Sequence, residues 1–206
     1  MNKNVLITGC SSGLGLALSN FYFKEFDLSK IDTIKKSLTS FMDNIHDIEV
    51  VYLNAGMLGE IKEMKHLSTN EIKEVLDLNV FANKELLDIL SKSKVKNVIG
   101  ISSGAALKGS KGWGAYSLSK SSLNMLLNLY AKEMLNTKIL AVAPGVIETP
   151  MTDIIRFEVD DNIFTSAKVL KEGEIQQPLD AATRLHEVIK RADEFESGSF
   201  IDVRKI

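Results

Sequence analysis

The chain has 206 residues, of which 45% are hydrophobic and 25% charged, and its formal net charge is −2. This length suits one domain with a sizeable core, and the composition is that of an ordinary soluble globular protein. The charge balance excludes a basic surface for nucleic acid or for an anionic membrane, and the single cysteine excludes a disulfide framework. Because no apolar run approaches the roughly 20 residues that span a bilayer, we expect a soluble, cytoplasmic protein.

Short apolar runs, most of them ending in glycine, predict buried β-strands. In chain order these runs are residues 4–9, 48–56, 95–104, 138–145 and, as a last candidate, 197–205. Between the strands, helical patterns of apolar residues predict helices. These are residues 13–22, 28–42, 68–93, 115–135 and 178–192. The helix predicted at 68–93 opens on a capping-box pair, Ser68 and Glu71. Strands that alternate with helices predict an α/β fold, a doubly wound parallel sheet that forms one domain over residues 1–206.

The carboxyl ends of the predicted strands carry short sequences suited to a ligand. Residues 8–15 read TGCSSGLG, and glycines there permit a tight turn while free N–H groups at a helix start can face a pyrophosphate. Alone, such a turn is also typical of an ordinary strand-to-helix connection. The other ends read NAG at 54–56, SSG at 102–104 and APG at 143–145. Since ligands of open α/β sheets bind along this edge, the four ends together indicate a nucleotide site.

Tyr116 and Lys120 lie four residues apart on one face of a predicted helix. Such a pair is usually solvated, but here it follows Ser103 by thirteen residues in a chain with the other signals. This constellation resembles the short-chain dehydrogenase/reductase family from Val5 to about Met151. The resemblance is carried by TGxxxGxG at 8–15, NAG at 54–56, Asn79, Ser103, YxxxK at 116–120 and PGVIETPM at 144–151. Leu53, where the family usually has a second asparagine, is a mild departure.

The resemblance implies a Rossmann-like fold and an oxidoreductase that uses NAD or NADP on a carbonyl/alcohol substrate. Tyr116 would be the general acid/base, and Lys120 would favour its phenolate, since an ordinary tyrosine titrates near 10. Ser103 would hold the substrate oxygen, and Asn79 would connect Lys120 to a water path. Strand alternation points Ser102 to the opposite side, so we expect it to be a structural hydroxyl. The family's habit also implies a homodimer or homotetramer.

The cofactor-binding residues implied by the resemblance follow the same strand ends. We expect contacts to the pyrophosphate from Gly9, Ser11, Ser12, Gly13, Leu14 and Gly15. We expect contacts to the adenosine from Asp27, Leu28, Asn54, Ala55 and Gly56. Contacts to the nicotinamide side are expected from Tyr116, Lys120, Pro144, Gly145, Val146 and Thr149. The irregular stretch 151–178 falls where the family carries its substrate lid.

The segment between the glycine turn and Asp27 is unusually short. Asp27 follows Gly9 by 18 residues, close to the roughly 20 expected for a ribose-binding acid. If FYFKEF were the second strand, however, the connecting helix before it would be only roughly 12 Å long. That is too short to run back along a six-residue strand of roughly 20 Å. The sequence FKEFDLSKIDTIKKSL resembles instead the family's third strand, with Asp27 near the adenine. We therefore hypothesise that the second strand and its helix are missing between about Phe21 and Lys24, by omission or by remodelling.

Other readings compete with these expectations. Trp113 could equally border the substrate or pack as a loop aromatic, and Cys10 is best explained as a small packing residue. The three histidines share no spacing with carboxylates, so no metal site is expected. One alternative function is a nucleotide-sugar epimerase or dehydratase, although the short tail after Pro150 leaves little room for its substrate domain. The other is a non-catalytic NAD(P)-binding sensor or scaffold, which would need no Tyr/Lys/Ser set.

Overall fold

The computed structural model describes residues 4–19 and 47–206 of the chain. Within these residues five parallel strands form one sheet in the order β1-β2-β3-β4-β5. Their bounds are Asn4–Ile7, Asp47–Leu53, Lys94–Ile101, Lys138–Ala143 and Phe200–Asp202. The expected parallel α/β fold is confirmed. Asp27, Leu28, the predicted helix 28–42 and the hypothesis of a missing strand all lie outside the described residues.

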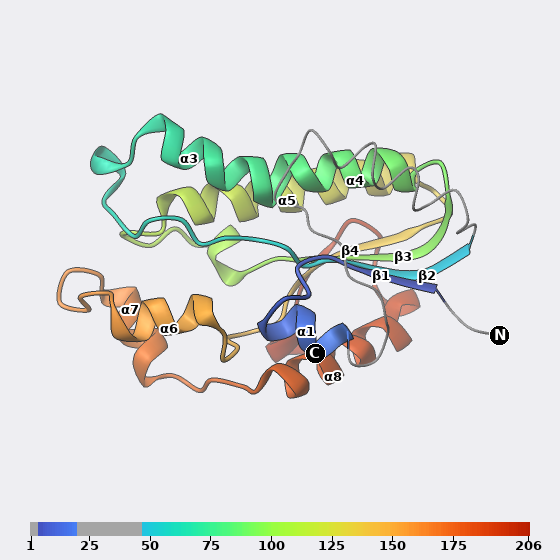
Figure 1. The fold of residues 1–206 in the computed structure, drawn as a ribbon. Coiled ribbons are helices and arrows are strands. Elements are labelled where there is room, and N and C mark those ends of the chain that lie inside the picture. The colour runs from blue at the N-terminus through green and yellow to red at the C-terminus, as the bar shows by residue number, and fades with distance from the viewer. Residues whose placement is uncertain (1–3, 20–46) are drawn as a thin grey trace.

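Helices cover both faces of the sheet (Figure 1). One face carries α3 (Thr69–Leu76), α4 (Ala82–Leu90) and α5 (Gly114–Glu133), and the other carries α1 (Gly13–Ser19) and α8 (Pro178–Lys190). The central strands are therefore buried on both sides, which explains their continuous apolar sequences. β1 and β2 are neighbours, yet the elements that follow them, α1 and α3, lie on opposite faces. This divergence opens a crevice at the carboxyl ends of the two strands.

The predicted helix 68–93 forms in three parts. It begins with the expected capping box, in which Ser68 accepts from the Glu71 amide and the Glu71 carboxylate accepts from the Ser68 amide. After α3 comes a π-helix, Asp77–Phe81, and then α4. The single helix expected from the sequence is thus interrupted. The sequence did not reveal the interruption, because a one-turn π segment leaves the apolar pattern on either side nearly helical.

The stretch after Pro150 is more regular than expected. It contains α6 (Pro150–Phe157) and α7 (Thr165–Glu172), which lie beside one end of the sheet (Figure 1). The last predicted strand is shorter than expected, because residues 203–205 turn into a 3-10 helix. None of the helices in the described residues combines the length and the apolar composition needed to cross a membrane.

Candidate active site

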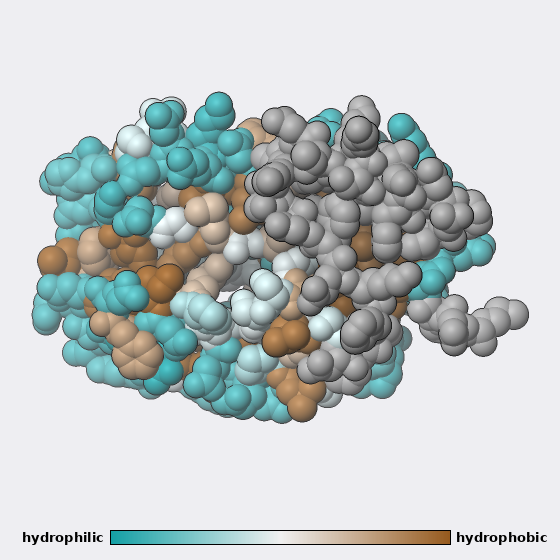
Figure 2. Space-filling view, viewed as in Figure 1, coloured by the Kyte–Doolittle hydropathy of each residue, from teal (hydrophilic) through white to brown (hydrophobic). Residues whose placement is uncertain are grey.

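A large cavity of about 1050 Å³ opens at the carboxyl ends of the strands. This volume is near the upper end of the range for ligand pockets. Figure 2 shows the hollow on this face, with hydrophobic side chains gathered at the end beside α6 and α7. Nearly every described residue of the predicted site lines it: Gly9, Ser11, Ser12, Gly13, Leu14, Asn54, Ala55, Gly56, Ser103, Tyr116, Lys120, Pro144, Gly145, Val146 and Thr149. Gly15 and Asn79 lie behind its wall.

The glycine turn is held in shape by the end of β2. The Thr8 hydroxyl accepts from the amides of Asn54 and Ala55 at 2.8 and 2.9 Å, and the Asn54 side-chain amide donates to the carbonyls of Thr8 and Gly9 at 3.0 and 3.1 Å. Gly9 has φ +68°, and a Cβ on Gly15 would lie 2.0 Å from the Gly9 carbonyl oxygen. The turn therefore requires glycine at both positions.

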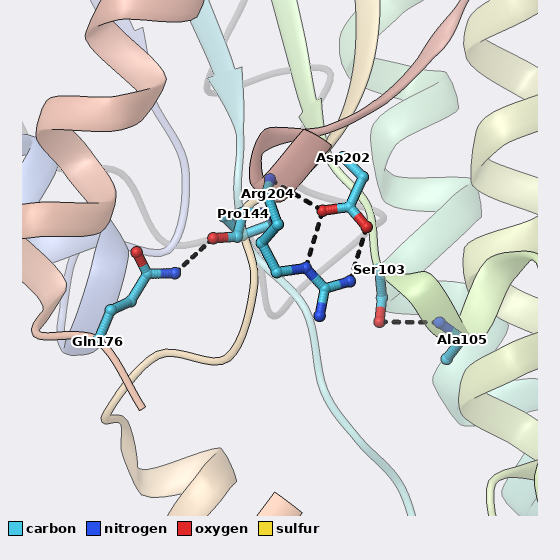
Figure 3. A network of polar contacts seen from close by, with 6 residues as sticks. All are labelled: Ser103, Ala105, Pro144, Gln176, Asp202 and Arg204. Atoms are coloured by element: carbon cyan, nitrogen blue, oxygen red, sulfur yellow. Dashed lines mark hydrogen bonds and ion pairs between the residues drawn. The ribbon is translucent and has the colours of Figure 1, made fainter. Parts of the chain in front are cut away.

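Tyr116 is placed in the cavity by the first turn of α5, where it lies within hydrogen-bonding reach of Ser103. Burial raises the pKa of the Tyr116 phenol, and the hydrogen bond with Ser103 acts in the opposite direction. The Ser103 hydroxyl also accepts from the Ala105 amide at 3.2 Å, which fixes its position at the end of β3 (Figure 3). The buried Ser102 hydroxyl donates to the Asn124 side chain, but Ser102 also lines the cavity, so the structural role expected for it stays a prediction.

Lys120 lies one helical turn after Tyr116 and is 4% exposed. Its ammonium donates to the Ile101 carbonyl at 2.8 Å and lies 5.6 Å from the centroid of the Tyr116 ring. Burial lowers the pKa of Lys120 from 10.5 to about 8. The help that the Lys120 ammonium would give to the Tyr116 phenolate stays a prediction.

Asn79 sits in the π-helix and is fully buried. Its side-chain oxygen accepts from the Met57 amide at 2.8 Å, and its nitrogen donates to the Met57 carbonyl and to the Ser119 hydroxyl. The Asn79 side chain thus ties the loop after β2 to α5, next to Lys120. Ser119, which the sequence reasoning missed, lies between the two signature residues of α5 and could have been found there.

The loop 144–149 forms the wall of the cavity that faces the glycine turn. The loop and the turn approach each other closely at Thr149 and Gly13. A Cβ on Gly13 would lie 2.7 Å from the Thr149 side chain. Thr149 caps α6 through a capping box with Thr152, and Pro150 occupies the first turn of that helix. The local sequence T-P-x-T therefore explains why α6 starts here.

The far end of the cavity is apolar. It is lined by Met57, Leu58, Trp113, Met151, Ile154, Ile155 and Leu170, and most of these were not predicted. Trp113 both borders the cavity and packs against the domain, since it is 7% exposed and its indole N–H donates to Ser166 of α7. Lys120 is the one charged side chain among the described residues that line the cavity.

The cavity fits a dinucleotide at its polar end. Glycines at 9, 13 and 56 leave open backbone where side chains would fill the space, and the start of α1 faces the same end. Cys10, also in the turn, is buried and its thiol donates to the Ile7 carbonyl, as befits a packing residue. No three His, Cys, Asp or Glu side chains gather as a metal site in the part of the chain described.

Comparison with known proteins gives the same family as the sequence motifs. The family model described as short chain dehydrogenase matches residues 19–159. A benzil reductase ((S)-benzoin forming) from Bacillus cereus is 26% identical over 248 residues, covering 98% of this chain and 99% of the relative. That stretch is longer than the 206 residues of this chain, so the relative contains residues without a counterpart here.

Two solved structures share the fold. A short-chain dehydrogenase/reductase of Saccharomyces cerevisiae has a TM-score of 0.82 at 22% identity, with 98% of this chain and 96% of that chain covered. ElxO with NADP bound has a TM-score of 0.77 at 21% identity, with 98% and 97% covered. These matches do not favour the sensor or the epimerase alternative. The chain belongs to the short-chain dehydrogenase family and is an oxidoreductase.

Proposed function

We propose that the protein reduces a ketone or aldehyde to the alcohol, with Tyr116 as general acid, and runs the reverse reaction with Tyr116 as general base. The observation that carries the proposal is that Tyr116, Ser103 and the buried Lys120 line the same cavity, with the Lys120 ammonium 5.6 Å from the centroid of the Tyr116 ring. A bound nicotinamide supplies the hydride for the carbonyl carbon in reduction.

The side chains of this chain handle the proton. The Ser103 hydroxyl donates a hydrogen bond to the substrate oxygen and holds it beside Tyr116. The Tyr116 hydroxyl gives its proton to that oxygen as the C–O double bond becomes a single bond, leaving a phenolate. Because burial raises the pKa of Tyr116, it stays protonated at neutral pH until a charge nearby stabilises the phenolate. We assign that part to the Lys120 ammonium, with Asn79 holding α5 and the adjoining loop in place.

The substrate that suits the cavity is uncharged and apolar. The far end of the cavity offers methionine, leucine, isoleucine and tryptophan side chains. The one charged side chain among the described lining residues, Lys120, is buried beside Tyr116 and bonded to the Ile101 carbonyl, so it does not belong to this apolar surface. An aromatic ketone fits this surface, and benzil, the substrate in the name of the Bacillus cereus relative, is of this kind. We expect kcat/KM for benzil to exceed that for small charged oxo acids by at least about a hundredfold, since an uncompensated charge is costly to bury.

The test is substitution of Tyr116 by Phe, assayed with benzil and both NADH and NADPH. Loss of the acid/base group is expected to lower kcat by about 100- to 10,000-fold while cofactor fluorescence still reports binding. Tyr130→Phe is the matched control, because Tyr130 lies on the same helix but bonds to Asp88, away from the cavity. Turnover retained in the Tyr116 variant would refute the assignment of the acid.

The homodimer or tetramer implied by family habit is also a proposal. It is supported by exposed apolar side chains along one face of α5, Leu118, Met125 and Leu129. Light scattering on the purified protein measures the mass directly, and a monomer at micromolar concentration would rule the proposal out.

A further inference from the structure

Gln176 binds the back of the loop that forms one wall of the cavity. Its side-chain amide donates to the Pro144 carbonyl, its backbone amide donates to the Val146 carbonyl at 3.0 Å, and its carbonyl accepts from the Glu148 amide at 2.9 Å. Residues Ile147 and Gln176 therefore pair as an isolated parallel bridge. The side-chain orientation is fixed, because the opposite amide orientation would set its oxygen against the Pro144 carbonyl oxygen.

Arg204 supports the same loop from a second side. A Cβ on Gly145 would lie 2.8 Å from the Gln176 side-chain nitrogen and 3.6 Å from the Arg204 Cδ atom, and one on Gly104 would lie 3.7 Å from the guanidinium. Figure 3 shows Arg204 reaching from Pro144 towards Ser103. The side chain thus spans the two loops that follow β3 and β4.

Asp202 holds Arg204 in this position. The guanidinium donates to both carboxylate oxygens at 2.8 and 2.6 Å, and the Arg204 amide adds a third bond at 3.1 Å (Figure 3). The Asp202 side chain is 9% exposed, and its pairing with Arg204 lowers the pKa of the carboxyl group. Because Asp202 pairs with Ala143 across the sheet, the fork is anchored to the strand from which the loop departs.

Neither Gln176 nor Arg204 lines the cavity, whereas the loop from Pro144 to Thr149 does. We propose that Gln176 and the Asp202–Arg204 pair form a clip that positions this loop for the nicotinamide half of the cofactor. Gln176 is the principal positioning residue. The loop leads directly into α6, and residue 176 follows α7, so the clip also joins the two stems of the helical segment 150–172. This inference rests on the function proposed above.

The test compares Gln176→Met with Gln177→Met. Methionine keeps the length of the side chain and removes the amide donor. Gln177 is the matched control, because its side chain reaches the exposed Glu148 carboxylate and not the backbone of Pro144. In the cofactor-free protein, hydrogen exchange of the Glu148 amide should rise about fivefold in the Gln176 variant and stay unchanged in the control. The dissociation constant of the reduced cofactor should rise by a similar factor, while urea unfolding reports global stability.

Each result decides the proposal. Unchanged exchange at the Glu148 amide would overturn the clip, and faster exchange with unchanged cofactor affinity would overturn its positioning role. A wild-type chain that binds neither NADH nor NADPH would defeat the proposed function, which the exchange measurement distinguishes because it needs no cofactor. If the Gln176 variant does not fold, Arg204→Lys carries the same measurements, since lysine keeps the charge and loses the fork to Asp202.

Discussion

Replacing Lys120 by Met should separate stability from activity in a way that depends on pH. Burial lowers the pKa of Lys120 from 10.5 to about 8, so at pH 7 the folded protein holds a buried charge at a cost of about 3 kcal/mol at 1.36 kcal/mol per pKa unit. Methionine removes that cost but leaves the Ile101 carbonyl without its donor, which costs about 1–3 kcal/mol. At pH 7 the variant should therefore equal the wild type in stability or exceed it by up to about 2 kcal/mol.

The sign of this difference should change as the pH rises. Between pH 8 and 10.5 the folded wild type has released the Lys120 proton while the unfolded chain still binds it, so the stability of the wild type rises with pH relative to the variant. The free-energy difference should move by roughly 1.4 kcal/mol per pH unit over this range. Below pH 8 the lysine is charged in both states and the difference should be flat.

The assay is urea unfolding of both proteins at several pH values from 7 to 10, with activity followed in parallel. Lys108→Met is the control, because that side chain is exposed. A Lys120 variant that loses several kcal/mol at pH 7, or whose difference from the wild type does not change between pH 8 and 10, would refute the argument from burial. Under the proposed mechanism the variant should also be nearly inactive at every pH.

Two further predictions concern residues in and behind the walls of the cavity. The hydrogen bond from Trp113 to Ser166 should couple the two residues, so Trp113→Phe, Ser166→Ala and the double variant should give a coupling free energy of about 1 kcal/mol in urea unfolding; simply additive losses would mean that the bond stabilises nothing. Gly15→Ala would put a Cβ 2.0 Å from the Gly9 carbonyl oxygen, and the strain should cost about 1–3 kcal/mol or more and weaken cofactor binding. Gly109→Ala, with no atom within 4 Å of its Cβ, should change neither quantity.

The sequence predicted the sheet and the polar end of the cavity because both depend on local signals. Apolar runs that end in glycine mark buried parallel strands, and their carboxyl ends meet by topology alone. Tyr116 and Lys120 could be paired because they share one helix. The choice of Ser103 came from family resemblance, and in the structure Ser103 and Tyr116 line the same cavity.

The rest depends on contacts between distant residues or on small irregularities. Gln176 lies 32 residues beyond Pro144, and nothing in its local sequence distinguishes it from Gln177. The apolar far end of the cavity draws on the segments around Leu58, Trp113 and Ile155, none of which carries a pattern of its own. Two helices of eight residues, α6 and α7, were too short to stand out by periodicity, although Thr149 and Pro150 marked the start of the first.

The π-helix at Asp77–Phe81 lets the continuous helical segment from α3 to α4 pack against two different hydrophobic clusters. A residue in an α-helix advances by about 100°, so one extra residue in a turn sets everything after it back by more than a quarter of a rotation. Before the π-helix the buried Val75 packs with Leu67 and Ala115 beside the cavity. After it, Leu86, Leu87 and Leu90 face the sheet. The irregular turn acts as a phase shift between two packing surfaces, and Asn79 occupies the joint where their directions change.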